Sequence, residues 1–324
     1  MGKNLGFTMA EILLSLTIIG VVAAITLPSL MANINERTWN TQRKALYARM
    51  SQAIAMMPQL NGYGEYEGTN TDGVVSATKD TAAEAFLTEG LSKVLKINNI
   101  CDAAHLADCG IAASFTNLAG STITWPTKLS ELNSMFTGSF DNTAIDGSVY
   151  SNPQNDIDTQ AAAFETQNGE TIALYYNPSC MDNRGVSTYY LALPKMCANF
   201  IYDLNGNKGP NMVGKDIGFI TAVYPLDSVV VAPMPLAQNA ALSSHMNAGA
   251  ACRTLDAESR LPDIEELSAM LYNRELLGIV DSGYWSSSLI SAGESGKAWG
   301  ASFGPATCYK GSRSSTTAVR CVKR

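Results

Sequence analysis

Seven cysteines and two histidines are the residues of this 324-residue chain whose chemistry depends most on spacing. The histidines, His105 and His245, stand far apart, and no two cysteines show the Cys-x-x-Cys spacing of a zinc site. Cysteines of an exported protein meet an oxidising environment, in which most of them pair. The pattern therefore favours disulfides over metal, and the odd count leaves one thiol over.

Position along the chain indicates two of the pairs. Cys101 and Cys109 enclose a short segment and are expected to bridge locally. Cys180 and Cys197 flank a strand-like run and are expected to be partners. The pairing of Cys308 stays open at this point.

A single carboxylate interrupts the apolar N-terminal part of the chain. Glu11 is the only ionisable side chain between residues 7 and 35. The twenty residues 12–31 are nearly all apolar and, at about 1.5 Å per residue, just span a bilayer core of about 30 Å. Lys3 favours keeping the leading end in the cytoplasm. A carboxylate in such a segment is costly, so Glu11 is a functional candidate.

Two other interpretations of this segment are a secretory signal peptide and a plain membrane anchor. A signal peptide carries its small-residue cleavage site after the apolar stretch, where this chain has Leu27-Pro28-Ser29-Leu30 and a continuing helical pattern. A plain anchor has no need of Glu11. Both therefore explain the segment less well than an anchor with an assembly role.

A basic leader over residues 1–6, then Phe7-Thr8 and Glu11 on an apolar helix, resembles the signal of type IV pilins and type II secretion pseudopilins. The resemblance implies that a prepilin peptidase cleaves between Gly6 and Phe7 and methylates Phe7. It also implies that Glu11 neutralises the N-terminal amine of a neighbouring subunit, which would relieve a costly buried charge. The protein would then be an inner-membrane precursor and later part of an extracellular filament.

The pattern predicts one helix over residues 7–57, with a transmembrane part over 7–31 and an end before Pro58. Pro28 matches a helix-kinking proline of pilins. In the second half, Leu46, Met50 and Ile54 form a stripe that can pack on a globular head.

Residues 58–225 are expected to form that head. A helix is predicted over 81–98, and Gln167-Asn168-Gly169-Glu170 is a hairpin turn between two strand-like runs. The strand-like runs are residues 161–166, 171–177, 188–193 and 198–202.

A polar loop follows the last of these runs. Asp203, Asn205 and Asp216 could hold calcium, as a similarly placed loop does in some major pseudopilins, but Lys208 and Gly214 break the EF-hand pattern. A tight Asn-Gly turn with capping Asp residues explains the same sequence and is favoured. No other cofactor is expected.

Residues 226–324 extend beyond an ordinary pilin. Helices are predicted over 237–255 and from Pro262-Asp263 to Tyr272. The order Arg-Leu-Pro, Tyr-Trp-Ser-Ser-Ser, Ala-Trp and Val-Arg-Cys-Val resembles a bacterial branch of the C-type-lectin-like fold, which includes adhesin and retroelement-diversified domains. The resemblance implies a Cys252–Cys321 disulfide, for which Cys308 could compete. The large aromatic residues Trp285, Trp299 and Phe303 are expected in the core.

The loops of this module are the expected ligand-binding surface, because they are rich in Ser, Gly and Thr with a few anchoring side chains. Polar surface loops without a ligand are the alternative. The calcium-binding motifs of sugar-binding lectins are missing. The candidate binding residues are Ser288, Ser302, Tyr309, Lys310, Ser312, Arg313 and Ser314.

Charge and motifs narrow the function. The net charge is −7, and residues 58–225 carry eight basic against eighteen acidic side chains, which argues against a nucleic-acid partner. No catalytic triad, paired-carboxylate or phosphate-loop pattern is present, so no enzyme is expected.

The predicted fold class is α+β, a pilin helix on an antiparallel-sheet head followed by a lectin-like domain. The predicted function is that of a minor filament subunit that binds a surface protein or glycan. The tip of the filament is one expected position for it. The alternative is a pseudopilin of a type II secretion-like system that contacts cargo.

Overall fold

The computed structural model describes residues 9–61, 80–132, 159–176, 196–223, 228–230, 235–279, 282–290, 295–303 and 307–323. The chain divides into two compact units, Met1–Ala45 and Leu46–Arg324. Within the described residues, no helix combines the length and the apolar character needed to cross a membrane. The span expected over residues 7–31 finds no support in that part of the chain.

Helix α1 (Met9–Asn61) crosses the boundary between the two units. It continues through Pro58, where the sequence predicted its end. A proline removes one backbone hydrogen bond, and at this position the loss falls in the last turn. The side chains of Leu46, Met50 and Ile54 are fully buried, as the helical spacing predicted.

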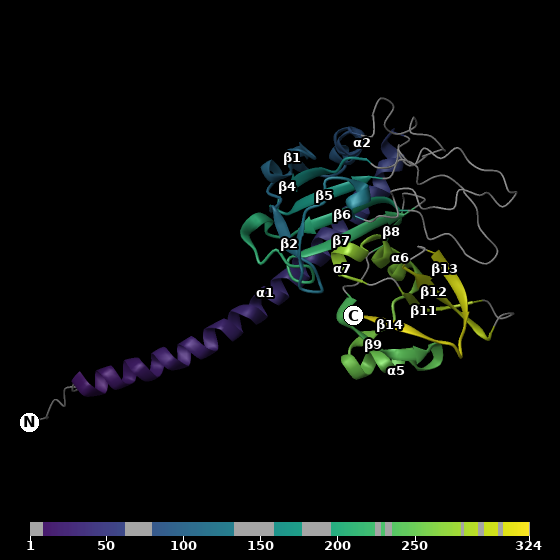
Figure 1. Cartoon of the computed structure of the whole chain (residues 1–324). Coiled ribbons are helices and arrows are strands. Elements are labelled where there is room, and N and C mark those ends of the chain that lie inside the picture. Colours follow the sequence, from purple (N-terminus) through teal and green to yellow (C-terminus); the bar gives the residue numbers. More distant parts are fainter. Residues whose placement is uncertain are drawn as a thin grey trace, which may run out of the picture. The chain divides into compact units, whose positions relative to one another are not determined.

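A six-stranded antiparallel sheet lies at the centre of residues 97–230 (Figure 1). Its strands are hydrogen-bonded in the order β1-β4-β5-β6-β7-β8. The predicted turn at residues 167–170 is confirmed, since it joins β4 to β5 with Gly169 at φ 83°. The strands are β1 (Ile97–Asp102), β4 (Ala162–Thr166), β5 (Thr171–Tyr176), β6 (Met196–Asp203), β7 (Ile217–Val223) and β8 (Ser228–Val230).

The single helix predicted over residues 81–98 is wrong. Helix α2 (Ala82–Ala85) passes into a π-helical turn (Phe86–Gly90) and a 3-10 turn (Leu91–Lys93). The residues from Ile97 on belong to β1 instead, because they pair with β4. Long-range strand pairing has overridden the local helical pattern.

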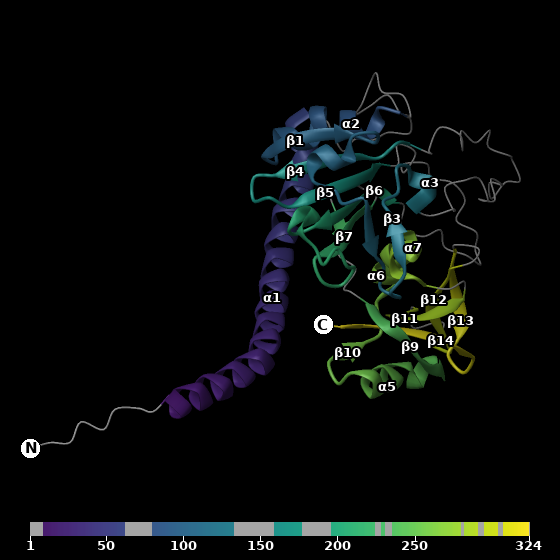
Figure 2. The same cartoon turned by 60° about the vertical axis from the view of Figure 1, so that its left-hand side comes forward.

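Smaller elements lie on one face of this sheet (Figure 2), where Phe115 and Trp125 share a core with Tyr175. Strands β2 (Ser114–Thr116) and β3 (Thr122–Thr124) form a two-stranded sheet, and α3 (Leu129–Leu132) is a single turn. A 3-10 turn (Leu106–Cys109) follows β1, and another (Gly206–Lys208) follows β6.

The C-terminal residues form a second sheet with the order β10-β14-β11-β12-β13, and β9 also pairs with β14. β11 and β14 are parallel at Tyr284 and Ala318, and the other pairs are antiparallel. The strands are β9 (Pro235–Ser244), β10 (Ser259–Arg260), β11 (Gly283–Leu289), β12 (Lys297–Ser302), β13 (Thr307–Ser312) and β14 (Thr316–Lys323). The helices are α5 (His245–Leu255), α6 (Ile264–Tyr272) and α7 (Arg274–Leu277).

Of the two helices predicted for the C-terminal residues, one is wrong in part and the other is confirmed. The helix expected over 237–255 is wrong in its first half, which is strand β9. The second is confirmed: Asp263 caps α6, its side chain accepts the Glu266 N–H, and the Glu266 side chain accepts the Asp263 N–H.

The predicted fold class is wrong. The structure is a mixed α/β arrangement with three sheets, and the second sheet is itself mixed. Residues 46–324 form one compact unit, and one core cluster contains Phe115 and Phe219 together with Leu267, Tyr284 and Phe303. The apolar side chains on either side of residues 225–235 share this core.

Candidate functional site

Trp299 on β12 and Lys310 on β13 form the centre of the expected binding surface. They pair in antiparallel register, and Lys310 Nζ lies 5.4 Å from the centre of the Trp299 ring. Both residues are half-buried. A cation over an indole face is stabilised by about 0.5–1 kcal/mol at such sites.

Two more residues extend this surface. Lys297 pairs with Ser312 on the same two strands, two positions from the Trp299–Lys310 pair, so all four side chains share one face. We call Lys297, Trp299, Lys310 and Ser312 the Trp299 face. It combines a flat aromatic ring, two ammonium groups and a hydroxyl, which suits a polar ligand with a planar or apolar side.

The loop after β13 is tied to the rest of the sheet through its backbone. The Arg313 N–H donates to the Gly296 carbonyl at 2.9 Å, and the Arg313 carbonyl accepts the His245 N–H at 3.1 Å. The Ser312 and Ser314 hydroxyls lie 2.9 Å apart and are exposed. The loop therefore presents hydroxyl groups on a backbone that is held at both sides.

His245 fixes the base of this loop. Its Nε2 lies 3.0 Å from the Ser286 carbonyl oxygen, and its ring meets Trp285 edge to face at 5.4 Å. Burial, and to a smaller extent the charge of Arg313, lower the pKa of His245. The imidazole is accordingly neutral at neutral pH and donates to the carbonyl through Nε2.

Tyr309 points to the opposite face of the sheet. Its ring centre lies 6.2 Å from that of Trp285, in the cluster that also contains Val319 and Cys321. A Cβ added at Gly300 would lie 2.7 Å from Tyr309 Cζ, so the ring covers that glycine closely. Tyr309 therefore stabilises the sheet and does not join the Trp299 face.

Ser288 and Ser302 also lie apart from the Trp299 face. The Ser288 hydroxyl accepts the Ile264 N–H at 3.0 Å at the start of α6, and Ser302 pairs with Gly283 and Thr307 within the sheet. Of the predicted binding residues, the structure groups Lys310, Ser312, Arg313 and Ser314.

Sequence reasoning missed Trp299 and Lys297 as surface residues. Trp285 and Phe303 are buried as expected, whereas Trp299 is half-buried. The signal was the alternation along β12, in which Lys297 and Trp299 occupy every second position and Ala298 is buried.

The loop after β6 behaves as the turn that the sequence favoured. Asp203 Oδ1 accepts the Asn205 N–H, and Asn205 Nδ2 donates to the Gly209 carbonyl at 2.8 Å. Asp216 uses both carboxylate oxygens to accept the N–H groups of Asn211 and Met212.

Two oxygens of this loop, Asp203 Oδ2 and Asn205 Oδ1, are buried without a partner in the described part of the chain. Burial, with the neighbouring charge of Asp216, raises the pKa of Asp203 to about 7. Two such oxygens are fewer than the six to eight that Ca²⁺ takes. No group of three His, Cys, Asp or Glu among the described residues could hold a metal.

The disulfides are partly as predicted. Cys101–Cys109 and Cys252–Cys321 are bonded, with Cα–Cα distances of 6.0 and 5.5 Å. Cys197 is also disulfide-bonded, while Cys180 and the side chain of Cys308 lie outside the described residues.

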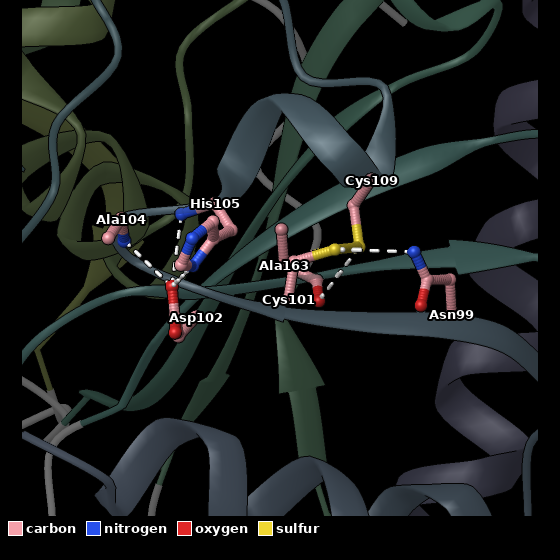
Figure 3. A network of polar contacts seen from close by, with 7 residues as sticks. All are labelled: Asn99, Cys101, Asp102, Ala104, His105, Cys109 and Ala163. Atoms are coloured by element: carbon pink, nitrogen blue, oxygen red, sulfur yellow. Dashed lines mark hydrogen bonds and ion pairs between the residues drawn. A yellow bond between two sulfur atoms is a disulfide. The ribbon is translucent and has the colours of Figure 1, made fainter.

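Figure 3 shows an exposed ion pair beside the first disulfide. His105 Nδ1 lies 2.7 Å from Asp102 Oδ1, which also accepts the backbone N–H groups of Ala104 and His105. This hydrogen bond raises the pKa of His105 and lowers that of Asp102. The Asp102–His105 pair closes the turn between β1 and the 3-10 helix. None of the other residues drawn in Figure 3 offers a nucleophile to it.

The predicted processing and assembly residues are at the N-terminus. Gly6 and Phe7 lie outside the described residues, and Glu11 is in α1 with its side chain outside them. The helix around Glu11 exposes a series of large apolar side chains. They are Ile12 at 46%, Leu13 at 62%, Leu14 at 63%, Leu16 at 62%, Ile18 at 56% and Ile19 at 64% exposure.

No protein-family model matches this sequence, and no curated protein is significantly similar to it.

Proposed function

We propose that this chain is a subunit of a type IV pilin-like filament that displays a ligand-binding surface on its C-terminal sheet. The observation that carries the proposal is the exposed apolar surface of α1 near Glu11. Apolar surface in water costs about 25 cal/mol per Å², so this part of the helix requires a cover. The same helix in other copies of the chain offers an apolar surface of matching length.

Processing and assembly follow from the same proposal. A prepilin peptidase cleaves after Gly6, the new amine of Phe7 meets Glu11 of a neighbouring subunit, and the charge pair forms inside the bundle of helices. The precursor resides in the inner membrane, and the mature chain is a minor subunit of an extracellular filament. Its acidic central part disfavours nucleic acid as a partner.

The Trp299 face is the proposed contact with a surface protein or glycan. Its support is the Trp299–Lys310 pair, which places a half-exposed ring beside a cation at the edge of a sheet. Tryptophan is one of the residue types that most often carry the binding energy of a recognition surface.

The test uses filaments sheared from cells that carry Trp299→Ala or Met246→Ala. Met246 is 66% exposed on α5 and serves as a matched loss of exposed apolar surface. We expect both variants to enter filaments in normal amount, and only Trp299→Ala to lose about tenfold in binding to target cells or a glycan array, from about 1.4 kcal/mol. Equal binding by both variants would exclude the Trp299 face. Absence of the wild-type chain from filaments, with loss of a secreted cargo on deletion, would favour the secretion-system alternative.

A further inference from the structure

The two histidines of the chain lie in opposite surroundings. His105 is exposed, and its hydrogen bond with the Asp102 carboxylate raises its pKa. His245 is 8% exposed, its Nε2 lies 3.0 Å from the Ser286 carbonyl oxygen, and its Nδ1 is buried without a partner in the described part of the chain. A protonated imidazole donates from both nitrogens, so a proton on His245 would create a buried charge and an unpaired N–H.

The elements that pack around His245 offer its imidazole no carboxylate. Strands β9, β10, β11 and β14, helix α5 and the turn over residues 312–316 contain no Asp or Glu. The nearest carboxylates along the chain, Asp256 and Glu258, follow the other end of α5, about 16 Å along the helix. The phenols of Tyr284 and Tyr309 are neutral below pH 7. The charged side chains of these elements are all basic, namely Arg253, Arg260, Arg313, Arg320 and Lys323.

Burial and charge both keep His245 neutral. Burial is the main cause that lowers its pKa, the hydrogen bond with the Ser286 carbonyl raises it, and the charge of Arg313 lowers it. A proton on His105 thus meets a carboxylate, whereas a proton on His245 meets a guanidinium. The folded site therefore resists protonation, and opening the site to water would remove that resistance.

The turn over residues 312–316, which joins β13 to β14, is held at the start of α5. The His245 backbone N–H donates to the Arg313 carbonyl at 3.1 Å. On β11, Trp285 meets the imidazole edge to face and donates its Nε1–H to the Ser243 carbonyl at 3.1 Å. Trp285 is buried, whereas every residue of the turn except Arg313 is exposed. The turn is therefore the neighbour of His245 that can move away with the least loss of buried surface.

We propose that His245 is an acid-sensitive switch for the turn over residues 312–316. At neutral pH the uncharged imidazole keeps the turn closed on the start of α5. In acid His245 binds a proton, the turn moves away, water reaches the imidazolium, and the hydrogen bond from the His245 N–H to the Arg313 carbonyl is lost. Ser312, Arg313 and Ser314 lie on this turn, so acid also weakens a ligand bound there. Only this last consequence rests on the proposed function.

The direction of the pH effect follows from the position of the pKa. The pKa of His245 in the closed site lies below the ordinary value of 6.5, so the open site binds the proton more tightly. The closed turn keeps its full stability above about pH 6.5 and loses it as pH falls further. Asp203 has the opposite sign, because its raised pKa stabilises the fold in acid. A loss of protection in acid that is confined to the turn is therefore not caused by Asp203.

Hydrogen exchange of the full chain in detergent at pH 7 and pH 5 tests the switch. The readout is the protection of peptides that cover residues 243–247 and 311–317, corrected for the intrinsic effect of pH on exchange. His245→Gln keeps a side-chain N–H for the Ser286 carbonyl but cannot take up a proton. His105→Gln removes the other histidine and is the matched control.

In wild type and His105→Gln, we expect the protection of both peptides to fall at least about tenfold between pH 7 and pH 5. In His245→Gln, it should be the same at the two pH values. Peptides from β5 should keep their protection in all three proteins, because the opening is local.

Two results would overturn the proposal. They are equal protection of the turn at pH 7 and pH 5 in wild type, and a fall in protection that persists in His245→Gln. If His245→Gln does not fold, NMR titration of the two imidazoles decides, with His105→Gln to assign the signals. The switch requires the His245 signal to titrate below pH 6.5 together with the loss of protection, and titration at or above 6.5 would contradict it.

Discussion

The side-chain amides of Asn199 and Asn273 hydrogen-bond each other in both directions, with Nδ2–Oδ1 distances of 2.8 and 3.1 Å. Asn199 lies on β6 of the first sheet, and Asn273 lies between α6 and α7. Both are fully buried, and Thr221 on β7 donates to Asn199 Oδ1 at 2.6 Å. This polar cluster joins the first sheet to the C-terminal segment inside their common core.

Replacing Asn273 by alanine should therefore weaken the whole unit. Asn199 would keep a buried amide without its partner, at a cost of about 1–3 kcal/mol. Urea unfolding of the full-length protein in detergent measures the change. The exposed Asn247→Ala on α5 is the control and should change the free energy of unfolding by less than about 0.5 kcal/mol. Equal effects of the two variants would argue against a structural role for the cluster.

Gly278 tests the same junction from another side. A Cβ at this position would lie 2.6 Å from the Ala119 Cβ, and the residue has φ +58°. Gly278→Ala should therefore destabilise the unit by about 1–3 kcal/mol through crowding and backbone strain. Gly296→Ala meets nothing within 4 Å and serves as the control. A Gly278→Ala protein as stable as the control would show that the loop before β3 is not packed on the end of α7.

The two identified disulfides should differ in their effect on stability. Cys252 and Cys321 are 69 residues apart, whereas Cys101 and Cys109 are 8 apart. Loop-closure entropy gives about 4 kcal/mol for the long loop and about 2.5 kcal/mol for the short one. Denaturant unfolding of the two double-alanine variants should rank them in this order. The reverse order would mean that the unfolded chain retains structure around the long loop.

Asp203 should make stability depend on pH. Its folded pKa of about 7 lies above the ordinary value of 3.8, so the folded state binds the proton more tightly than the unfolded state. The stabilisation is fully present below about pH 4 and is lost as pH rises through 7. Thermal unfolding between pH 4 and 8 should show this slope, and Asp203→Asn should flatten it.

The same experiment separates the turn from a calcium site. If the loop is only a turn, millimolar calcium leaves the Tm at pH 7.5 unchanged. A rise in Tm with calcium that Asp203→Asn abolishes would contradict this and would show that Asp203 and Asn205 hold the ion.

Local sequence signals predicted the structure correctly where the interacting residues lie close together in the sequence. The turn at Gly169 and the cap at Asp263 are of this kind, because each depends on residues within a few positions. The first half of the helix expected over 237–255 failed for the opposite reason. Its composition favours a helix, but β14 pairs with it as β9.

Long-range packing explains the remaining differences. The sequence gives no sign that Asn199 and Asn273, which are 74 residues apart, form a hydrogen-bonded pair. Alternation along β12 and β13 could have separated Tyr309 from Lys310, since adjacent residues of a strand face opposite ways. The same alternation places Trp299 on the face of exposed Lys297 and away from buried Ala298.

The filament proposal depends most on Glu11. The most direct measurement compares the amount of this chain in sheared surface filaments for wild type, Glu11→Gln and Glu36→Gln, where Glu36 is an exposed carboxylate farther along α1. We expect wild type and Glu36→Gln to be present and cleaved after Gly6, and Glu11→Gln to be cleaved but at least tenfold depleted. Equal amounts of all three chains in filaments would contradict an assembly role for Glu11, and absence of the wild-type chain would contradict the filament proposal itself.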